Sequence, residues 1–537
     1  MKKILFNLAF LIISFSLFAQ KLQRPKLVVG IVVDQMRWDY LYRFYNSYSS
    51  DGFKRILNNG FSCENTFIPY TPTVTAAGHT CIYTGSVPAI HGIMGNNWYD
   101  RDQKKLVYCA DDNSVQTVCS SSIAGKMSPR NLWANTITDE LRMATNFRNK
   151  TIAIAIKDRG AILPGGHTAN AAYWFDNASG GWISSSYYMN DLPDWVKKFN
   201  DKRLPDAYMK KSWDILNPQN TYIYSTPDNE PYEGNILGES NTFPHRTDTA
   251  TVNKYEIFRS TPYGNTFTFE MGKAAVENEQ LGKHDETDFL ALSFSPTDYV
   301  GHTFGPNSME AEDIYLRFDK NLGAFLKYLD ATVGAGQYLI FLTADHGAAH
   351  VPAFSREHKM PGGSISDLGL RKDLNEQLKK EYNVAGIVAQ VINYQVYLDN
   401  SIVTQNNLNL VNIKKTIIQT LLMNPGVAGA FDLSDLQNTT LPIQIKNMVT
   451  NGYNQKLSGD IQFYYKPQWF DGGEKGTTHG AWNPYDAHIP LLWYGWGIKK
   501  GKTNREVYMT DIAPTLSALL HIQMPNGTIG KVIEEIK

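Results

Sequence analysis

The sequence has few cysteines, almost no net charge and, beyond its first twenty residues, no long apolar run. Its 51 lysines and arginines nearly balance 52 aspartates and glutamates, which argues against a nucleic-acid-binding protein that neutralises phosphates with excess cations. No segment after residue 20 is apolar over the length of a membrane span, so we expect a soluble mature protein without a nucleic-acid partner. Glycine (41) and proline (24) are near ordinary usage, which excludes collagen-like and linker-dominated chains.

The four cysteines all lie in one early stretch of the chain. They are Cys63, Cys81, Cys109 and Cys119. An exported protein can keep such residues as disulfides, and four cysteines allow three pairings. The alternative, zinc binding, lacks the CxxC pairs that are typical of structural zinc sites.

The first residues have the order of a secretory signal peptide. Lys2 and Lys3 precede a mostly apolar run over residues 4–18, and Ala19-Gln20 is a plausible cleavage point. We therefore predict a signal peptide over residues 1–19 and a periplasmic or secreted protein. The alternative is an uncleaved N-terminal anchor.

Four apolar, mostly β-branched or aromatic runs each end in polar residues. They cover residues 27–33 before Asp34, 151–156 before Lys157, 289–294 before Asp298, and 338–343 before Asp345. Continuous apolar strands suit a sheet that is covered on both faces. In such sheets ligands bind beyond the carboxyl ends of the strands, where all four runs deliver their polar residues.

Helical patterns lie between these strands, over residues 128–145, 308–331 and 510–520. Strands that alternate with helices predict an α/β fold with a doubly wound, mostly parallel sheet. Hydrophobic residues make up 42% of the 537 positions, which is enough for a large core. We predict one domain over residues 20–537, with insertions at about 174–265 and 355–470 that decorate the sheet and roof the site. The alternative is a separately folded second domain.

Six side chains near the strand ends or in loops are suitable metal ligands. Carboxylate with imidazole suits zinc, and six groups are too many for one catalytic ion, which normally takes three protein ligands. Two metal ions can stabilise both the attacking and the leaving oxygen of an in-line displacement. Taken singly, each residue is more often a cap, a turn residue or an ordinary histidine, as we expect for His91, His167, His350 and His488. The six candidates are Asp34, Asp298, His302, Asp345, His346 and His479.

Thr75 precedes a short helical pattern, so its hydroxyl is placed where a helix N-terminus favours a negative oxygen. A threonine hydroxyl is a weak nucleophile unless a base or a metal activates it. The alternatives are that Thr75 only caps the helix, or that Thr71 or Thr73 is the nucleophile.

Three further residues could bind an anion. Asn96 offers an amide donor, although Gly-Asn pairs also mark turns. Lys157 and Arg159 end a predicted strand, and two cations there suit a dianionic group with several oxygens. The alternative interpretation is that Lys157 and Arg159 are ordinary solvated cations at the end of a strand.

As an ordered set, these motifs resemble the alkaline phosphatase superfamily, and most of all the PafA-type bacterial alkaline phosphatases that use threonine as nucleophile. The set includes TAAGHT at 75–80, GNNW at 95–98, KDRG at 157–160 and DHG at 345–347, and the resemblance runs from about Leu27 to the C-terminus. It implies a two-zinc hydrolase of phosphate monoesters. It implies one zinc on Asp298, His302 and His479, a second on Asp34, Asp345, His346 and Thr75, and phosphoryl oxygens held by Asn96, Lys157 and Arg159.

The mechanism that this resemblance implies has two steps. Thr75 attacks phosphorus in line and forms a phosphothreonine, which water then hydrolyses to phosphate.

Three rival functions are distinguished from this one by single features of the sequence. A nucleotide pyrophosphatase/phosphodiesterase of the same superfamily would share the metals, Thr75 and Asn96, but Lys157 and Arg159 favour the more highly charged monoester. A sulfatase would carry a C/S-x-P-x-R pattern, which residues 71–80 lack. A non-catalytic metal-binding protein would have no need of an activated hydroxyl.

Overall fold

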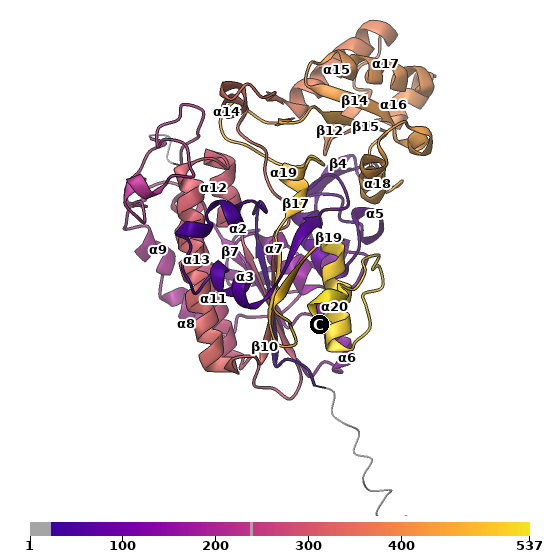
Figure 1. Cartoon of the computed structure of the whole chain (residues 1–537). Helices are drawn as coiled ribbons and strands as arrows, with labels where there is room; N and C mark the ends of the chain where they lie inside the picture. The colour runs from indigo at the N-terminus through magenta and orange to yellow at the C-terminus, as the bar shows by residue number, and fades with distance from the viewer. Residues whose placement is uncertain (1–22, 237–239) are drawn as a thin grey trace, which may run out of the picture.

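The computed structural model describes residues 23–236 and 240–537, so the predicted signal peptide over residues 1–19 lies outside the described residues. The described chain is built around one eleven-stranded sheet (Figure 1). The path along it is β17 (His488–Ile489), β2 (Phe61–Phe67), β18 (Leu491–Gly495), β10 (Tyr338–Thr343), β1 (Leu27–Val33), β9 (Asp288–Phe294), β6 (Thr151–Ala155), β7 (Ala171–Asp176), β8 (Gly181–Ser185) and β5 (Thr117–Val118), with β19 (Gly501–Tyr508) paired to β2.

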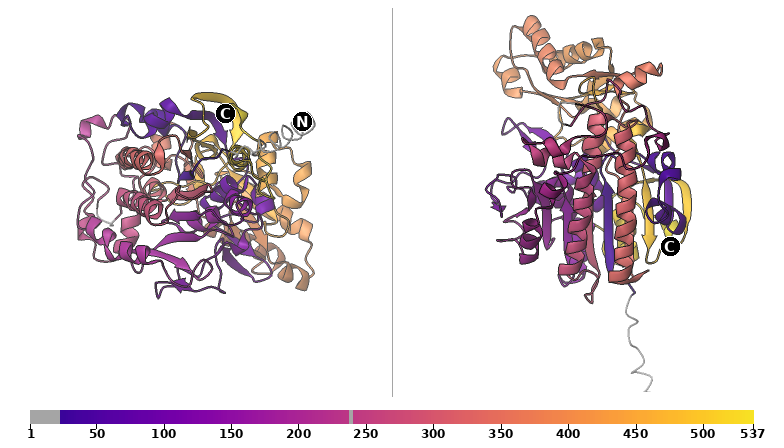
Figure 2. Two further views of the ribbon diagram at one scale, coloured as in Figure 1. Left: turned by 90° about the horizontal axis from the view of Figure 1, so that it is seen from below. Right: turned by 90° about the vertical axis from the view of Figure 1, so that its left-hand side faces the viewer.

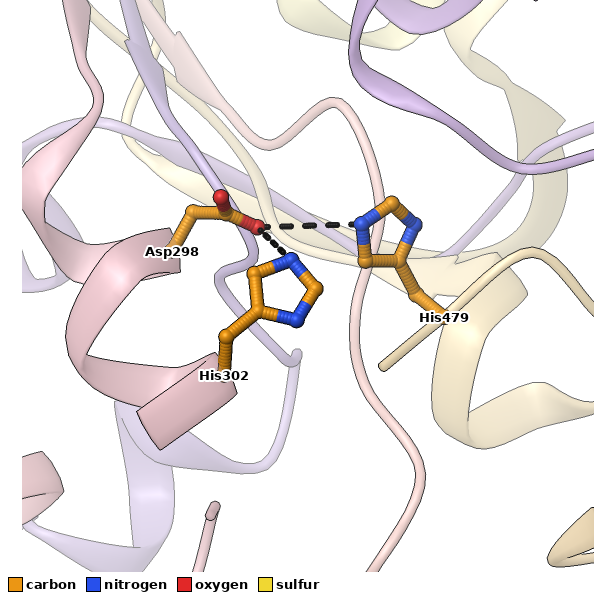
Figure 3. Close-up of side chains that lie close together, drawn as sticks. All are labelled: Asp298, His302 and His479. Atoms are coloured by element: carbon orange, nitrogen blue, oxygen red, sulfur yellow. Dashed lines mark ion pairs between the residues drawn. The ribbon is translucent and has the colours of Figure 1, made fainter. Parts of the chain in front are cut away.

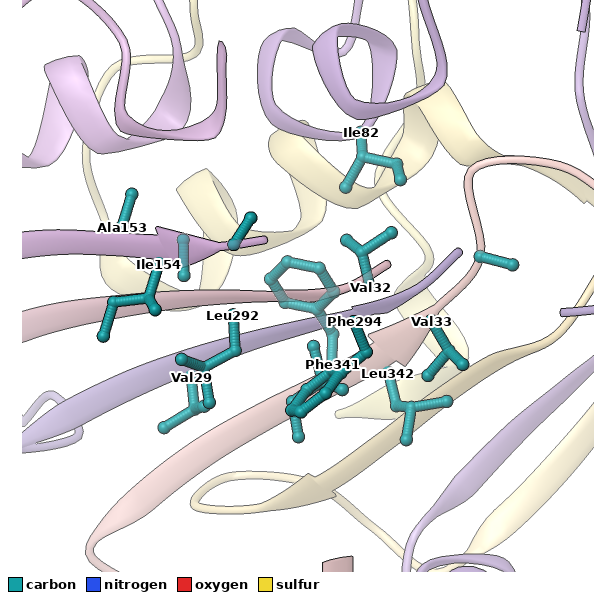
Figure 4. Close-up of a cluster of buried hydrophobic side chains, with 14 of the residues drawn as sticks. Val29, Val32, Val33, Ile82, Ala153, Ile154, Leu292, Phe294, Phe341 and Leu342 are labelled. Carbon is teal, nitrogen blue, oxygen red and sulfur yellow. The ribbon is translucent and has the colours of Figure 1, made fainter. Parts of the chain in front are cut away.

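The centre of the sheet is parallel and buried on both faces. β10, β1, β9, β6 and β7 run in the same direction, and every residue of β1 is buried. Figure 4 shows Val29, Leu292 and Phe341 packed together in this core. The four predicted apolar runs are therefore strands, and the predicted α/β class is confirmed.

Helices cover both faces of this sheet. On one side α4 (Thr75–Thr84) packs with α6 (Ile137–Ala144), α7 (Asp158–Gly165) and α20 (Ile512–Leu520). On the other side α11 (Pro262–Asn278) and α13 (Met309–Leu329) stand next to each other (Figure 2). Each layer is held by apolar burial, which is worth about 1.5–3 kcal/mol per large aliphatic or aromatic side chain.

Two helix predictions need correction. The helix predicted over residues 128–145 is split: Pro129–Asn131 form a 3₁₀ turn, and α6 begins only after Thr136. Thr136 and Asp139 form a capping box there, which is a stronger start signal than Ser128-Pro129. The third predicted helix starts at Ile512, and Asp511 accepts hydrogen bonds from Tyr508 N and Lys531 N instead of capping it.

The two segments predicted as insertions differ in structure. The earlier one begins inside the main sheet, because β7 and β8 belong to it. Much of the later one forms a small cap with its own core above the carboxyl ends of the central strands (Figure 1). The cap contains the sheet β12 (Val388–Ile392), β13 (Gln395–Leu398), β15 (Ile461–Tyr465) and β14 (Val427–Asp432), and the helices α15 (Asp367–Tyr382) and α17 (Leu410–Met423).

The four cysteines are unpaired. Cys63, Cys81 and Cys109 are buried, and Cys119 is exposed. None of the helices in the described part of the chain combines the length and apolar character needed to cross a membrane.

Candidate active site

The six candidate ligands meet at the carboxyl edge of the parallel strands. Asp34 directly follows β1, and Asp345 and His346 follow β10. Asp298 and His302 lie on α12 (Pro296–Phe304), the helix after β9. His479 comes from the loop between β16 (Trp469–Asp471) and α19 (Pro484–Ala487). They form two trios, each with ligand atoms within 4.8 Å of one another: Asp298, His302 and His479, and Asp34, Asp345 and His346.

The first trio, which we call the Asp298 trio, depends on one helix turn and one loop. Asp298 and His302 stand four residues apart on α12 and so share one face of the helix. Asp298 Oδ1 lies 3.1 Å from His302 Nε2 and 3.7 Å from His479 Nε2 (Figure 3). One carboxylate oxygen and two ring nitrogens thus converge on one point.

The second trio, the Asp345 trio, converges on His346. Its Nε2 atom lies 3.5 Å from both Asp34 Oδ1 and Asp345 Oδ2. These two oxygens are buried and make no hydrogen bond among the described residues; the ring of His79 approaches Asp345 Oδ2 to 3.3 Å. A buried carboxylate oxygen without a partner is costly, so this donor set fits a cation.

All three histidines present the same nitrogen to the trios. The Nδ1 atoms of His302, His346 and His479 lie 2.7–3.0 Å from the main-chain oxygens of Thr477, Gly347 and Thr73. A carbonyl oxygen only accepts, so Nδ1 carries the proton and the Nε2 lone pair faces the trio. This orientation by an outer hydrogen bond is typical of metal-ligating histidines. The residues present therefore fit two divalent ions.

Negative charge is in excess at this edge. Burial and the neighbouring Asp298 and Asp345 carboxylates raise the pKa of Asp34 well above its usual range. Lys157 Nζ lies 2.7 Å from Asp34 Oδ2 and 2.5 Å from Asp298 Oδ2, and so joins one carboxylate of each trio. Burial disfavours this ammonium, but Asp298 and Asp34 outweigh it and raise the pKa of Lys157. The single ammonium of Lys157 faces the carboxylates of Asp34, Asp298 and Asp345. This imbalance favours the binding of additional cations at the site.

Thr75 is the threonine that faces the trios. It is the first residue of α4, Val74 is the N-cap, and no side-chain capping bond is made. Its Oγ1 atom lies 3.4 Å from His346 Nε2. The hydroxyls of Thr71 and Thr73 instead donate to main-chain oxygens, at Gly480 and Ala481. Of the three threonines considered, only Thr75 has its hydroxyl beside a trio.

Asn96 and Arg159 are held by their neighbours. Asn96 Oδ1 accepts a 2.9 Å hydrogen bond from Ala76 N, which leaves its Nδ2 group as the available donor. Arg159 Nη1 donates to the Tyr108 hydroxyl at 3.2 Å, and that hydroxyl donates to Asp158. The site therefore has an amide donor beside Thr75 and a guanidinium fixed by a neighbouring tyrosine.

The sequence analysis assigned no role to two buried residues of the site, Gln35 beside Asp34 and His79 within the TAAGHT motif. Gln35 donates through its main-chain N to Asp345 Oδ1 at 3.1 Å and through Nε2 to Asp298 Oδ1 at 2.8 Å. His79 Nδ1 lies 2.9 Å from Thr75 O and 3.3 Å from Asp345 Oδ2, while its Nε2 lies 2.7 Å from Ser293 Oγ. Their positions, one after Asp34 and four after Thr75, were the available signal.

The cap reaches the site through one turn. Asn393 and Tyr394 join β12 to β13, and both have positive φ, at 57° and 60°. Asn393 Nδ2 donates to Asn97 O at 2.8 Å, directly after Asn96. The Tyr394 hydroxyl lies 3.4 Å from His479 O. The turn thus touches the loops that carry an anion-site residue and a candidate metal ligand.

This chain is similar in sequence to a protein-family model and to several bacterial enzymes. Residues 28–486 match the family model of type I phosphodiesterase / nucleotide pyrophosphatase. Alkaline phosphatase PhoV of Synechococcus elongatus is 54% identical over 522 residues, which cover 97% of this chain and 94% of PhoV. A Myroides odoratus protein named calcium-transporting ATPase is 51% identical over 97% of this chain and 96% of its own.

Alkaline phosphatase PafA of Elizabethkingia meningoseptica is 48% identical over 538 residues, which cover 98% of both chains. The crystal structure of wild-type PafA superposes with a TM-score of 0.94 and covers 96% of this chain and 100% of that one. With a family model matched over most of its length and PafA matched in both sequence and fold, this chain belongs to the alkaline phosphatase superfamily, among the PafA-type alkaline phosphatases, which are hydrolases of phosphate monoesters.

Proposed function

We propose that this alkaline phosphatase is an exported two-zinc enzyme that works through a phosphothreonine at Thr75. The observation that carries the proposal is the position of the Thr75 hydroxyl, at the start of α4 and 3.4 Å from a nitrogen of the Asp345 trio. A hydroxyl placed beside a cation site and at a helix N-terminus is favoured as an oxyanion.

The two trios are the groups that would hold the ions. Mixed imidazole and carboxylate ligands suit zinc. In such a site two bound ions lower the energy of the attacking and leaving oxygens during an in-line displacement.

The chain's own residues do the rest. The Thr75 hydroxyl gives up its proton to solvent, and its oxygen forms a bond to phosphorus as the bond from phosphorus to the leaving oxygen breaks. The departing alkoxide takes a proton from solvent. Water then attacks phosphorus, the bond from phosphorus to the Thr75 oxygen breaks, phosphate leaves, and the Thr75 oxygen regains a proton. Asn96, Lys157 and Arg159 hold the non-bridging oxygens; cations bound to Asp34 and Asp298 would leave the Lys157 ammonium available for this role.

The proposal is tested by trapping the covalent intermediate. The enzyme is mixed with excess p-nitrophenyl phosphate, quenched in acid and digested, and the peptide that contains Thr75 is weighed by mass spectrometry. We expect a phosphoryl adduct on Thr75, its loss in Thr75→Ala together with monoester turnover, and its retention in Thr73→Ala. An intact turnover in Thr75→Ala, or an adduct on Thr73, would refute the assignment.

Phosphodiester hydrolysis is the second candidate, because the matching family model carries that activity in its description. Turnover of p-nitrophenyl phosphate and of its bis ester by the same zinc-loaded sample decides between them. A faster diester reaction would overturn the monoesterase assignment. Export is tested separately, by the cell fraction in which the activity appears and by the N-terminal residue of the mature protein.

A further inference from the structure

Gln35 occupies an unusual place in the molecule. It follows Asp34 at the end of β1, is 3% exposed, and has a φ of 64°, in the left-handed region. A residue with a Cβ atom loses about 1–2 kcal/mol in this conformation. Such strain persists only where the surrounding structure requires it, and often at functional sites.

The strained backbone lets Gln35 bond in two directions. Its main-chain N donates to Asp345 Oδ1 at 3.1 Å, and its side-chain Nε2 donates to Asp298 Oδ1 at 2.8 Å. The amide orientation is fixed, because the carboxylate of Asp298 accepts and Nε2 is the end of the amide that donates. The other end, Oε1, packs where Gly301 leaves room, since a Cβ atom at that position would lie 1.9 Å from Oε1.

These two bonds reach one carboxylate of each trio. Asp298 Oδ1 is the atom nearest the histidines of its trio, at 3.1 Å from His302 Nε2. Asp345 contributes its other oxygen, Oδ2, to the second trio. One residue therefore hydrogen-bonds a carboxylate of each trio.

We propose that Gln35 is a positioning residue for the metal centre, with its side chain acting on the Asp298 trio and its main-chain N–H on the Asp345 trio. This inference rests on the proposed two-cation function. Outer-shell partners of metal ligands typically contribute 10- to 100-fold in metal affinity. Only one of the two bonds comes from the side chain. Side-chain substitutions should therefore lower the affinity of the Asp298 trio for its ion and leave the affinity of the Asp345 trio unchanged.

The test measures zinc affinity directly, without reference to turnover. Wild-type protein, Gln35→Met and Gln35→Gly are loaded with zinc and dialysed against graded concentrations of a chelator, and zinc per chain is measured by elemental analysis. Methionine keeps the length of the side chain without its amide. Glycine also lacks the amide, but it keeps the main-chain N–H and tolerates positive φ, so it guards against simple misfolding.

We expect two zinc ions per wild-type chain, and in both variants one ion whose affinity falls about 10- to 100-fold while the other is unchanged. The matched control is Gln390→Met, which removes an amide from the cap and should leave both affinities unchanged. If the Gln35 variants keep both affinities, or lose both equally, the positioning role of Gln35 is wrong, but the proposed two-zinc function is unaffected. A wild-type protein that holds fewer than two ions would overturn the proposed function and this inference with it.

Discussion

At the scale of single residues, the geometry of the site depends on which atom of each side chain faces the two trios, and residue identity alone does not reveal that atom. The sequence predicted all six candidate ligands and Thr75, and the structure brings these residues together. It did not predict which nitrogen of His302 and His479 faces inward, because their Nδ1 partners are main-chain oxygens that lie far away in the sequence. It also missed Gln35, since a glutamine after an aspartate has no distinctive pattern.

Lys157 and Arg159 should matter more for monoesters than for diesters. A monoester dianion presents one more charged oxygen, and a hydrogen bond to a charged group is worth about 1.5–3 kcal/mol. Lys157→Ala or Arg159→Ala should therefore lower kcat/KM for p-nitrophenyl phosphate by roughly 10- to 100-fold, and the bis ester less. Steady-state kinetics on both substrates measure this difference. Equal losses on the two substrates would contradict the proposed contact with the dianion.

Glu233 should make stability fall as the pH rises. Burial, with Glu310 and Glu230 nearby, raises the pKa of this carboxyl to about 9. The folded chain then keeps a proton that the unfolded chain releases near its ordinary pKa, so the contribution is complete below that value and is lost as the pH rises to about 9. Glu233→Gln should raise the Tm near pH 9 relative to wild type, with little change near pH 5.

Thermal melts from pH 5 to pH 9 measure this effect. The exposed Glu376→Gln is the control and should follow the wild-type profile. A Glu233→Gln profile parallel to wild type would mean that Glu233 is ionised in the fold.

At the scale of elements, the sequence predicted best the central strands, whose apolar residues reflect their burial on both faces of the sheet. The strands β1, β6, β9 and β10 were recognised because they are mostly apolar, and the structure buries every residue of each. The start of α6 was misplaced because its capping box outweighs an earlier Ser-Pro signal. The contact of the β12–β13 turn with the site joins residues 296 positions apart, which no local pattern reveals.

This turn should influence turnover from outside the site. Asn393→Ala removes the hydrogen bond to Asn97 O, next to Asn96. A hydrogen bond of about 1 kcal/mol corresponds to roughly a fivefold change in rate. We therefore expect kcat/KM for the monoester to fall about fivefold in a variant whose cap stays folded.

Asn407→Ala is the matched control, because Asn407 is an exposed cap residue that also has positive φ, at 51°. It should lose similar backbone stability without any change in rate. The same rate loss in both variants would show that the effect is a general weakening of the cap.

At the scale of the whole molecule, the sheet does two separate tasks. Its core consists of buried apolar side chains and includes no residue of either trio, while its carboxyl edge gathers the carboxylates that the cap overlies. Metal removal should therefore abolish turnover and lower the Tm without unfolding the chain at room temperature. The Tm should fall because an ion that binds only the folded state stabilises it by mass action.

Circular dichroism, thermal melts and monoester turnover before and after chelation check this expectation. Added zinc should restore both turnover and Tm. Loss of secondary structure on chelation would show that the core depends on the ions, and full activity after exhaustive chelation would refute a metal-dependent mechanism.

The two-zinc centre is tested most directly by anomalous diffraction of zinc-loaded crystals at the zinc edge. We expect two strong peaks per chain, one among Asp298, His302 and His479 and the other among Asp34, Asp345 and His346 beside the Thr75 hydroxyl. A single peak, or peaks away from these two trios, would contradict a two-zinc centre.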